Sequence, residues 1–581
     1  MTRRDRDVTP KRDVIPKRDM IPKVEEEPTK RAIRPALILA TVALVHLAIT
    51  LPALNPAPHN GGDNAGYLSL AYSLVTGAGY VEAWDPALVP HTKYPPLYPV
   101  LLAGAMGLGA EAWITFKLLS LLLVTVSVTL CFAWVRDRHG ILMATGVSLV
   151  LAFSPAFLWS TNWILSDPLF LALTFACLWS FHRSEQVAVP SRWILAGCVF
   201  AILSTFTRTA GLPLVLAVGG ALALARHWRA LAGFGVAFVT PNVLWWLRSR
   251  AGGGAQYVSE FWLIDPYQPD LGQAGIGDLA ARVLENLQGY VLVHIPAGLS
   301  PWSGGALTAL GLVLMAAALA GWVARIGVRW TVVELFTPLY FGLILLWPAV
   351  WSGDRFALPL YPLILFYAAE ALARGASRIG PRLPLAAGVV ASAFLLVPSM
   401  QSWGQSVSGA RDCREVVRQA GPFACYGEGF QQFVSAARWV GENVPDGAAV
   451  FSRKPRIFYT LSGVRSRTYP LSADPERFFR EAREVGVSYV VLDRVDRLGG
   501  AYVGAVVQDR PWAFCGLAAV GEGEVRTQIL GIVEGAVDPG DATPGSSIRL
   551  AACPEGMVRP EPRSLPAYSA SRLPLLALPS P

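Results

Sequence analysis

The sequence is short of charge. Asp, Glu, Lys and Arg make up only 15% of its 581 residues, whereas 53% of the residues are hydrophobic. A soluble domain of average composition carries about 25% charged residues, so this chain has too few charges to cover a water-facing surface. The composition therefore excludes an ordinary soluble enzyme.

The sequence also lacks the motifs of several common kinds of site. It contains no CxxC pair or histidine cluster of the kind that binds zinc, no GxGxxG motif of a dinucleotide-binding fold and no P-loop. We therefore expect no required cofactor. Weak binding of a divalent metal by isolated Asp residues stays open.

Long apolar stretches are abundant instead. Stretches close to the length that a bilayer requires recur from about residue 33 to residue 398. They predict a polytopic α-helical membrane protein with about 11 transmembrane helices. The predicted spans are 35–53, 112–135, 140–157, 164–181, 193–206, 210–225, 230–247, 304–324, 332–350, 357–372 and 383–398.

The charged residues predict the orientation of these spans. If the N-terminus lies inside, every short inner loop is basic, as the positive-inside rule requires. We therefore expect a multi-pass protein of the plasma membrane with a cytoplasmic N-terminus and an extracytoplasmic C-terminal domain. The net charge of +8 is then mostly an orientation signal and does not indicate nucleic-acid binding. The inner-loop cations are Arg136, Arg138, Arg183, Arg192, Arg226, Arg229, Arg325, Arg329, Arg374, Arg378 and Arg382.

The sequence before and between the spans divides further. Residues 1–34 contain three copies of the hexapeptide Arg-Asp-x-x-Pro-Lys and are predicted to form a disordered cytoplasmic tail. The transmembrane domain is predicted at 35–398, with long outer segments at 55–111 and 248–303 that we expect to carry function. Two short helices in the first outer segment are expected to lie along the outer membrane interface.

Water-soluble sequence begins after residue 398. Residues 399–553 predict a small extracytoplasmic α/β domain with strands at Ala448–Ser452 and Ser488–Asp493. Residues 554–581 are rich in Pro and Ser and are predicted to be disordered.

Four of the seven cysteines fall in this outer domain, and an even number in an oxidising compartment favours disulfides. We predict that Cys413 pairs with Cys425 and Cys515 with Cys553. Four unpaired cysteines that serve as small buried residues are the alternative.

Five ionisable residues that are scattered in the sequence meet at the outer membrane boundary in this topology. Asp63 and Lys93 belong to the first outer segment, and Asp167, Arg208 and Arg355 lie at the outer ends of spans. Ionisable groups at this depth are costly unless they are paired or serve a site. Each one alone can extend its charge to water, but the set as a whole predicts a shared site.

Two aspartates of this set are candidates for chemistry. Asp63 lies just before a predicted helix, where it can cap the helix and can also accept a proton from an attacking hydroxyl. Asp167 starts another helix, with Pro168 at the favoured first position. For Asp167 a structural role is the alternative to a role in orienting a substrate.

The cations of the set point to a phosphate. Lys93 precedes Tyr94-Pro-Pro-Leu-Tyr-Pro99, whose three prolines fix the backbone and hold Lys93 and Tyr98 in place. This segment can be only a stiff turn. Together with Arg208 and Arg355 it predicts instead a cationic pocket for a phosphate group next to lipid, with Tyr98 orienting the substrate.

At these residues the sequence resembles the GT-C superfamily of membrane glycosyltransferases, in particular the branch that contains protein O-mannosyltransferases and the lipid A aminoarabinose transferase. Five motifs match in order across residues 35–372. They are an Asp followed by a Tyr-containing helix and Gly (Asp63 to Gly79), Lys-x-Pro-Pro-Leu-Tyr-Pro (Lys93 to Pro99), Leu-Ser-Asp-Pro-Leu (Leu165 to Leu169), Thr-Arg-Thr-Ala-Gly-Leu (Thr207 to Leu212) and Asp-Arg-Phe-Ala-Leu-Pro-Leu-Tyr-Pro (Asp354 to Pro362).

The resemblance implies a polyprenyl-phosphate sugar as donor and a hydroxyl of a lipid, glycan or protein as acceptor. Asp63 would act as the base, with inversion at the anomeric carbon. Lys93, Arg208 and Arg355 would offset charge on the leaving lipid phosphate, and Asp167 would orient a sugar hydroxyl or a cationic partner. Many relatives have Asp-Glu at the first motif, whereas Asn64 follows Asp63 here. This departure puts in doubt any role of a second carboxylate, including metal binding.

Two other classes of protein are the alternatives. A transporter or lipid flippase would place polar residues and broken helices near the bilayer midplane, often in two repeated halves, and we find no such duplication. A non-catalytic assembly factor or sensor whose outer domain binds a wall polymer would have a sequence similar to that of an inactive transferase.

Overall fold

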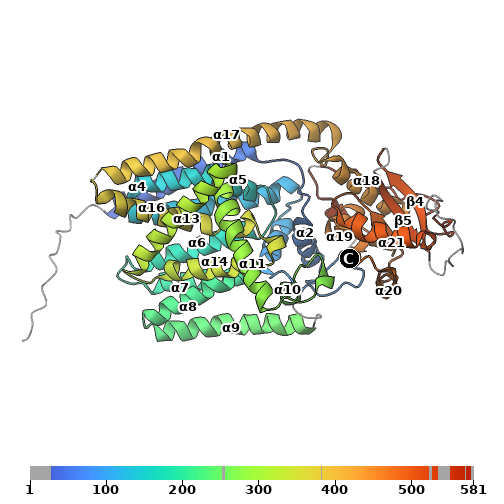
Figure 1. The fold of residues 1–581 in the computed structure, drawn as a ribbon, viewed down its shortest axis with the longest axis horizontal. Coiled ribbons are helices and arrows are strands. Elements are labelled where there is room, and N and C mark those ends of the chain that lie inside the picture. Colours follow the sequence, from blue (N-terminus) through green and yellow to red (C-terminus); the bar gives the residue numbers. More distant parts are fainter. Residues whose placement is uncertain are drawn as a thin grey trace, which may run out of the picture.

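A computed structural model describes residues 28–251, 256–380, 382–522, 526–533, 550–569 and 571–577. The hexapeptide repeats lie outside the described residues, and the predicted disordered tail 1–34 extends too far because a helix begins at Pro28. The described chain forms a large bundle of helices with a smaller domain, built around a β-sheet, at one end (Figure 1). The predicted fold class, a polytopic helical membrane protein with a small α/β domain, is confirmed.

Every predicted span contains a helix of the bundle, but only five of the described helices are long and apolar enough to cross a membrane. Shorter helices complete the bundle. A helix of 13 residues such as α8 rises about 20 Å, which is less than the ~30 Å thickness of the hydrocarbon core. The bundle consists of α1 Pro28–Thr50, α4 Trp113–Phe153, α5 Pro155–Thr161, α6 Asp167–Ser184, α7 Ser191–Thr207, α8 Leu212–Leu224, α9 Trp228–Ala251, α13 Gly304–Ile326, α14 Val332–Leu345, α16 Leu360–Ser377 and α17 Leu383–Ala420.

Helix α4 contains nearly all of the predicted span 112–135 and most of the span 140–157, whose last residues lie in α5. Gly140 interrupts it with φ 83° and ψ 172°, a backbone conformation that glycine adopts without steric cost. The interruption lies next to Arg136 and Arg138, where the sequence predicts an inner loop. The two spans are therefore two helices that follow each other without an intervening loop.

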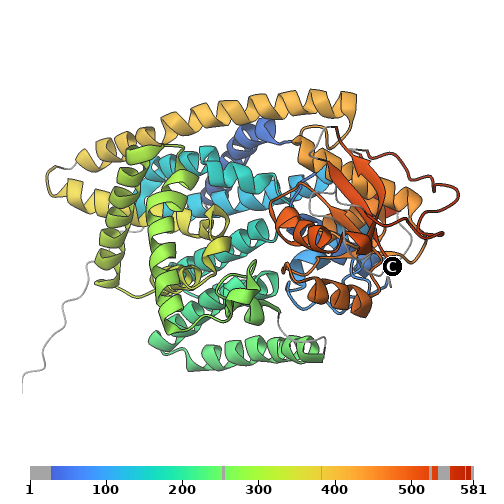
Figure 2. The same cartoon turned by 45° about the vertical axis from the view of Figure 1, so that its right-hand side comes forward.

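Helix α17 differs most from the prediction. It continues from Leu383 to Ala420, so the predicted domain boundary at residue 398 falls inside a helix that leads from the bundle to the outer domain (Figure 1 and Figure 2). The change from apolar to polar sequence at this point does not end the helix, because polar residues form helices as well as apolar ones do. Gly421, with φ 97°, follows the last helical residue.

The outer domain contains a five-stranded sheet in the order β2-β1-β3-β5-β4. The first three strands in this order run parallel, and β5 pairs antiparallel with both β3 and β4. The two predicted strands are confirmed as β1 Ala449–Phe451 and β3 Tyr489–Leu492. The other elements are α18 Glu428–Asn443, α19 Pro455–Ser462, β2 Arg465–Arg467, α20 Pro475–Val485, α21 Ala505–Asp509, β4 Phe514–Val520 and β5 Thr527–Ile532.

The two long outer segments form helices next to this domain. In the first, α2 Gly62–Val75 and α3 Leu97–Gly107 match the predicted helices. Helix α2 is largely buried and packs against α19, so it lies between the bundle and the outer domain rather than on an open surface (Figure 1). The second segment contains α10 Gln256–Phe261, α11 Ile276–Gly289, a π-helical turn at Tyr290–His294 and α12 Ile295–Leu299.

Both predicted disulfides are present. Cys413 is bonded to Cys425 and Cys515 to Cys553. The first bond ties the end of α17 to the segment that leads into α18, and the second ties β4 to the C-terminal segment. The remaining cysteines, Cys131, Cys177 and Cys198, are buried in the bundle.

Disorder was predicted for residues 554–581, but residues 554–569 and 571–577 pack against the rest of the protein. The Tyr489 hydroxyl donates to the Met557 carbonyl at 3.0 Å, and the Arg559 amide donates to the Asn443 carbonyl at 2.7 Å. Leu573 and Leu575 are each 1% exposed and pack in the apolar cluster around α2 and α3. The prediction was based on the average composition, which is rich in Pro and Ser, and did not consider these two leucines separately.

This packing predicts that Leu573→Ala destabilises the protein. Loss of a buried leucine side chain costs about 2 to 5 kcal/mol of unfolding free energy, so the melting temperature of the detergent-solubilised protein should fall. Val558→Ala lies in the same segment at a position that is 39% exposed, and it should change the free energy by less than about 0.5 kcal/mol. Equal melting temperatures for the two variants would contradict the packing described.

Candidate functional site

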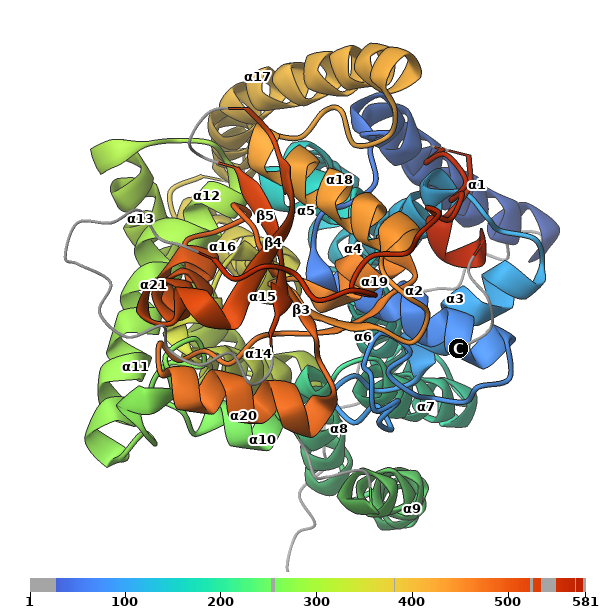
Figure 3. The same cartoon turned by 90° about the vertical axis from the view of Figure 1, so that its right-hand side faces the viewer.

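A cavity of about 1600 Å³ lies where the bundle, the outer segments and the outer domain meet. Figure 3 shows the outer domain in front of the ends of the bundle helices. The lining residues include seven cationic and five acidic side chains, so positive charge is in excess. They also include six tryptophans, namely Trp84, Trp159, Trp163, Trp262, Trp347 and Trp351.

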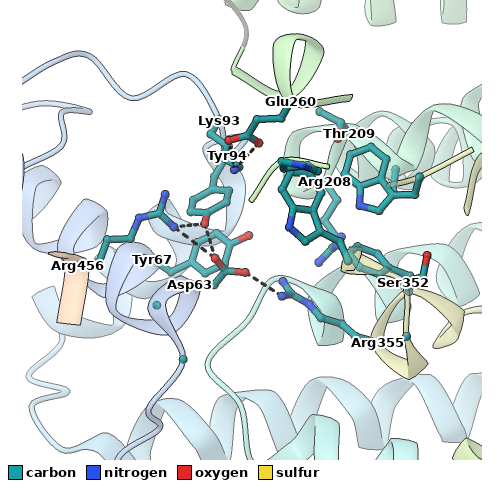
Figure 4. A pocket seen from close by; sticks show the side chains of 18 of the residues that line it. Asp63, Tyr67, Lys93, Tyr94, Arg208, Thr209, Glu260, Ser352, Arg355 and Arg456 are labelled. Atoms are coloured by element: carbon teal, nitrogen blue, oxygen red, sulfur yellow. Dashed lines mark hydrogen bonds and ion pairs between the residues drawn. The ribbon is translucent and has the colours of Figure 1, made fainter. Parts of the chain in front are cut away.

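Asp63 lies in the cavity at the start of α2. Gly61, and not Asp63, precedes the first helical residue, so the predicted capping role of Asp63 is wrong. The carboxylate instead accepts hydrogen bonds from the Tyr94 hydroxyl at 2.6 Å and from Arg355 Nη1 at 2.8 Å (Figure 4). Arg456 Nη1 lies 3.3 Å from its Oδ1 atom. The Asp63 side chain is 36% exposed, so it stays open to the cavity despite these partners.

These partners keep Asp63 ionised. Burial favours the protonated form, but the charges of Arg355 and Arg456 and the Tyr94 hydrogen bond outweigh it. They hold the pKa of Asp63 well below its ordinary value. A carboxylate in this state is a weak base and a strong acceptor of hydrogen bonds.

Arg355 connects the two predicted aspartates. It belongs to α15 Asp354–Ala357, and its Nε atom lies 3.0 Å from Asp167 Oδ2 while its Nη1 atom contacts Asp63. Asp167, the first residue of α6, is also bound by Arg208 at 2.6 Å. Arg208 follows α7 directly. The structure thus brings together four of the five predicted ionisable residues in one continuous network.

Lys93 lines the same cavity but has a different partner. Its Nζ atom lies 2.6 Å and 2.9 Å from the two carboxylate oxygens of Glu260, a residue of α10 that the sequence did not single out (Figure 4). Burial lowers the pKa of Lys93, and the charge of Glu260 acts in the opposite direction. Its ammonium also lies 5.4 Å from the ring centre of Trp351.

A buried histidine holds the segment that presents Lys93 and Tyr94. His91 Nε2 accepts a hydrogen bond from the Tyr94 amide at 2.8 Å. Its Nδ1 atom therefore carries the proton and donates to Glu82 at 2.7 Å. Arg248 donates to the carbonyls of His91 and Tyr80, at 2.7 Å each. The backbone before the prolines is thus fixed on both sides.

Tyr98 does not reach the cavity. It is fully buried behind Tyr67, with their ring centres 5.1 Å apart and the rings edge to face. Because α3 begins at Leu97, Tyr98 faces the core of the helix pair, whereas Tyr94 lies before the prolines and points to Asp63. The predicted role of Tyr98 in orienting a substrate is therefore not supported by its position, and Tyr94 has the contact expected for such a role.

Several residues of the site were not predicted. Arg453, Lys454 and Arg456, which follow β1, and Arg467, at the end of β2, all line the cavity. These positions are at the carboxyl ends of parallel strands, where α/β domains commonly bind ligands. Arg453, Lys454 and Arg456 could have been predicted by applying this rule to the predicted strand Ala448–Ser452.

No group of three or more His, Cys, Asp or Glu suited to a metal ion is found among the residues that the structure describes. The guanidinium groups of Arg355 and Arg456 occupy the positions beside Asp63 that a cation would need.

No protein-family model and no curated protein matches the sequence. Solved structures match it in fold. ArnT from Cupriavidus metallidurans, bound to undecaprenyl phosphate, matches with a TM-score of 0.50 and 14% identity over 87% of this chain and 100% of that chain. The oligosaccharyltransferase of Archaeoglobus fulgidus, in a complex with Zn and sulfate, matches with a TM-score of 0.52 and 15% identity over 84% of this chain and 72% of that chain.

A third match is the archaeal oligosaccharyltransferase AglB from Archaeoglobus fulgidus in complex with an inhibitory peptide and a dolichol-phosphate. Its TM-score is 0.51, with 13% identity over 84% of this chain and 73% of that chain. These similarities confirm at the level of the fold the predicted resemblance to GT-C membrane glycosyltransferases.

The network around Arg355 predicts a loss of stability in Arg355→Gln. The variant removes the guanidinium shared by Asp63 and Asp167, and we expect a loss of about 2 to 3 kcal/mol, less than for a fully buried pair because Asp63 is partly exposed. The melting temperature in detergent measures this loss. Arg418→Gln breaks a pair with Glu415 whose arginine is 72% exposed, and it should have almost no effect. A melting temperature of Arg355→Gln equal to that of Arg418→Gln would be evidence against the network.

Proposed function

We propose that the protein is a membrane glycosyltransferase that moves a sugar from a polyprenyl-phosphate donor to an acceptor hydroxyl in the cavity described above. The observation that carries the proposal is an ionised, partly open carboxylate, Asp63, beside a group of cations at the outer-domain end of an apolar bundle. Neighbours of the same fold bind undecaprenyl phosphate or dolichol-phosphate, which supports a lipid-linked donor.

The cations of the cavity suit the phosphate of such a donor. Lys93, Arg208 and Arg355 each have a carboxylate partner, so they are held in place before the donor arrives. Lys454 lines the cavity without an ion pair to any residue that the structure describes. When the sugar leaves, the lipid phosphate gains negative charge, and cations fixed next to it stabilise that charge.

The apolar lining suits the rest of the donor. Trp159, Trp347 and Leu343 lie on the bundle side of the cavity, where a prenyl chain would enter from the lipid. A pocket for a single small ligand has a volume of about 300 to 1,000 Å³. The volume of about 1600 Å³ is larger than this and leaves room for an acceptor beside the sugar.

Asp63 would act on the acceptor. A carboxylate has about four acceptor positions, and Tyr94, Arg355 and Arg456 occupy three of them. The remaining position can accept a hydrogen bond from the acceptor hydroxyl. The hydroxyl oxygen attacks the anomeric carbon from the face opposite the phosphate and inverts it, its proton passes to Asp63, and the bond from the anomeric carbon to the phosphate oxygen breaks. Because its pKa is low, Asp63 takes the proton only as the new bond forms.

Two alternatives fit the structure less well. A transporter or flippase places its polar residues near the middle of the membrane, whereas the polar residues of this cavity lie where the bundle meets the outer domain. A non-catalytic assembly factor would not require an ionised carboxylate with an open acceptor position. The transfer assay below separates both from a transferase.

Asp63→Asn should abolish most sugar transfer. Removal of a catalytic base costs about 100- to 10,000-fold, measured as transfer from polyprenyl-phosphate sugars in a membrane preparation. Asp85→Asn is the matched control, because Asp85 lines the same cavity and pairs with Arg467 without contacting Asp63. Because this pair also helps to hold the outer domain in place, we expect some loss of activity, but far less than in Asp63→Asn. Full activity of Asp63→Asn would remove the base assignment, and no transfer by the unmutated protein from any such donor would favour the alternatives.

We also propose that the cavity and the outer domain face the outside of the plasma membrane. Ile276, in the second outer segment, is 90% exposed, and Ile379, in a predicted inner loop, is 80% exposed. In intact cells a membrane-impermeant maleimide should label Ile276→Cys, whereas Ile379→Cys should react only after lysis. The reverse labelling pattern would show that the orientation is inverted.

A further inference from the structure

Arg456 extends from the outer domain to the carboxylate of the membrane domain. It lies in the first turn of α19, and its Nη1 atom is 3.3 Å from Asp63 Oδ1 and also contacts the Tyr94 hydroxyl (Figure 4). Its guanidinium lies over two rings, 5.1 Å from the centre of Trp84 and 5.0 Å from that of Tyr94. The side chain is 18% exposed, so little of it faces solvent.

Helix α2 leaves space for this arginine. Gly66 lies one helical turn after Asp63, and a Cβ atom at Gly66 would be only 2.9 Å from Arg456 Cδ. Alanine is favoured over glycine inside a helix by roughly 1 kcal/mol, so glycine costs helix stability here. Because Gly66 has no side chain, the aliphatic part of Arg456 packs directly against α2 and its guanidinium contacts Asp63.

Other contacts fix α19 and β2 on the first outer segment. Arg467 binds both carboxylate oxygens of Asp85, at 2.7 Å and 2.8 Å. The Ser466 amide donates to the Trp84 carbonyl at 2.6 Å. The position of Arg456 therefore does not depend on its own contact with Asp63, because the outer domain is held in place separately.

We propose that Arg456 is a positioning residue of the transferase site, through which the outer domain holds Asp63 and Tyr94 in the arrangement that transfer requires. This inference rests on the proposed function. Arg355 holds one oxygen of Asp63 from the membrane domain, and Tyr94 and Arg456 hold the other. The carboxylate cannot rotate without losing one of these contacts, and its side chain stays 36% exposed in the lining of the cavity. The outer domain thus completes the site instead of only covering it.

The proposal predicts how two substitutions combine. Arg456→Gln should lower kcat by about 10- to 100-fold, as expected when a reacting group is misplaced, with little change in the KM for the donor. Because Arg456 acts through Asp63, the same change in an Asp63→Asn background should lower the residual rate by less than about 2-fold. Arg456→Lys keeps the charge but not the planar fork that contacts both Asp63 and Tyr94, so it should restore only part of the rate.

Arg467→Gln is the matched control. It breaks an ion pair between the same two parts of the chain but does not contact Asp63, so its effect should be equally large with Asp63 and with Asn at that position. If the effect of Arg456→Gln were also the same in both backgrounds, Arg456 would serve only the docking of the domain, and the proposal would be wrong.

Thermal unfolding tests the same pairing without an activity assay. Arg456→Gln should lower the melting temperature less in Asp63→Asn than in the unmutated protein, whereas Arg467→Gln should lower it equally in both. If Arg456→Gln has this smaller effect in Asp63→Asn but the protein shows no transfer activity, the proposed function is wrong and the pairing of Arg456 with Asp63 stands. If the protein is an active transferase but Arg456→Gln lowers the melting temperature equally in both backgrounds, only the proposed role of Arg456 is wrong.

Discussion

The structure depends on a line of alternating charges that runs from Arg456 through Asp63, Arg355 and Asp167 to Arg208. These residues come from α19, α2, α15, α6 and the end of α7, elements that are far apart in the sequence. A charge in an environment of low polarity is costly when its partner is removed. No one of these elements can therefore shift far without leaving a charge unpaired, and the cavity between them keeps its shape.

Much of the fold follows from the sequence because the bilayer imposes strong rules. Apolar length locates the helices of the bundle, and all predicted spans contain one. Apolar length and loop charge predict less well the structure of segments that lie outside the membrane. Polarity changes at residue 398, yet α17 continues to Ala420 because helix formation does not depend on polarity. The C-terminal segment packs through Leu573 and Leu575, two residues that average composition conceals.

The site was predictable to the extent that its residues contrast with their surroundings. Asp167, Arg208 and Arg355 stand out because they are charged residues in apolar sequence, and Asp63 and Lys93 because they lie in Gly- and Pro-rich stretches of the first outer segment. Arg456 belongs to a water-soluble domain with many other arginines, so its charge alone does not single it out, and only its place after a predicted strand could have done so. The choice between Tyr94 and Tyr98 depends on where α3 begins, and sequence patterns locate helix ends less precisely than helices.

We propose that the cavity binds a polyprenyl-phosphate sugar and releases the lipid phosphate. The most direct measurement uses the purified, unmutated protein in liposomes that contain polyprenyl-phosphate sugars and follows the appearance of free polyprenyl phosphate together with a glycosylated acceptor. We expect equal amounts of the two products with at least one donor of this class. If the donor lipid instead binds and crosses the bilayer with its sugar still attached, the protein is a flippase and not a transferase.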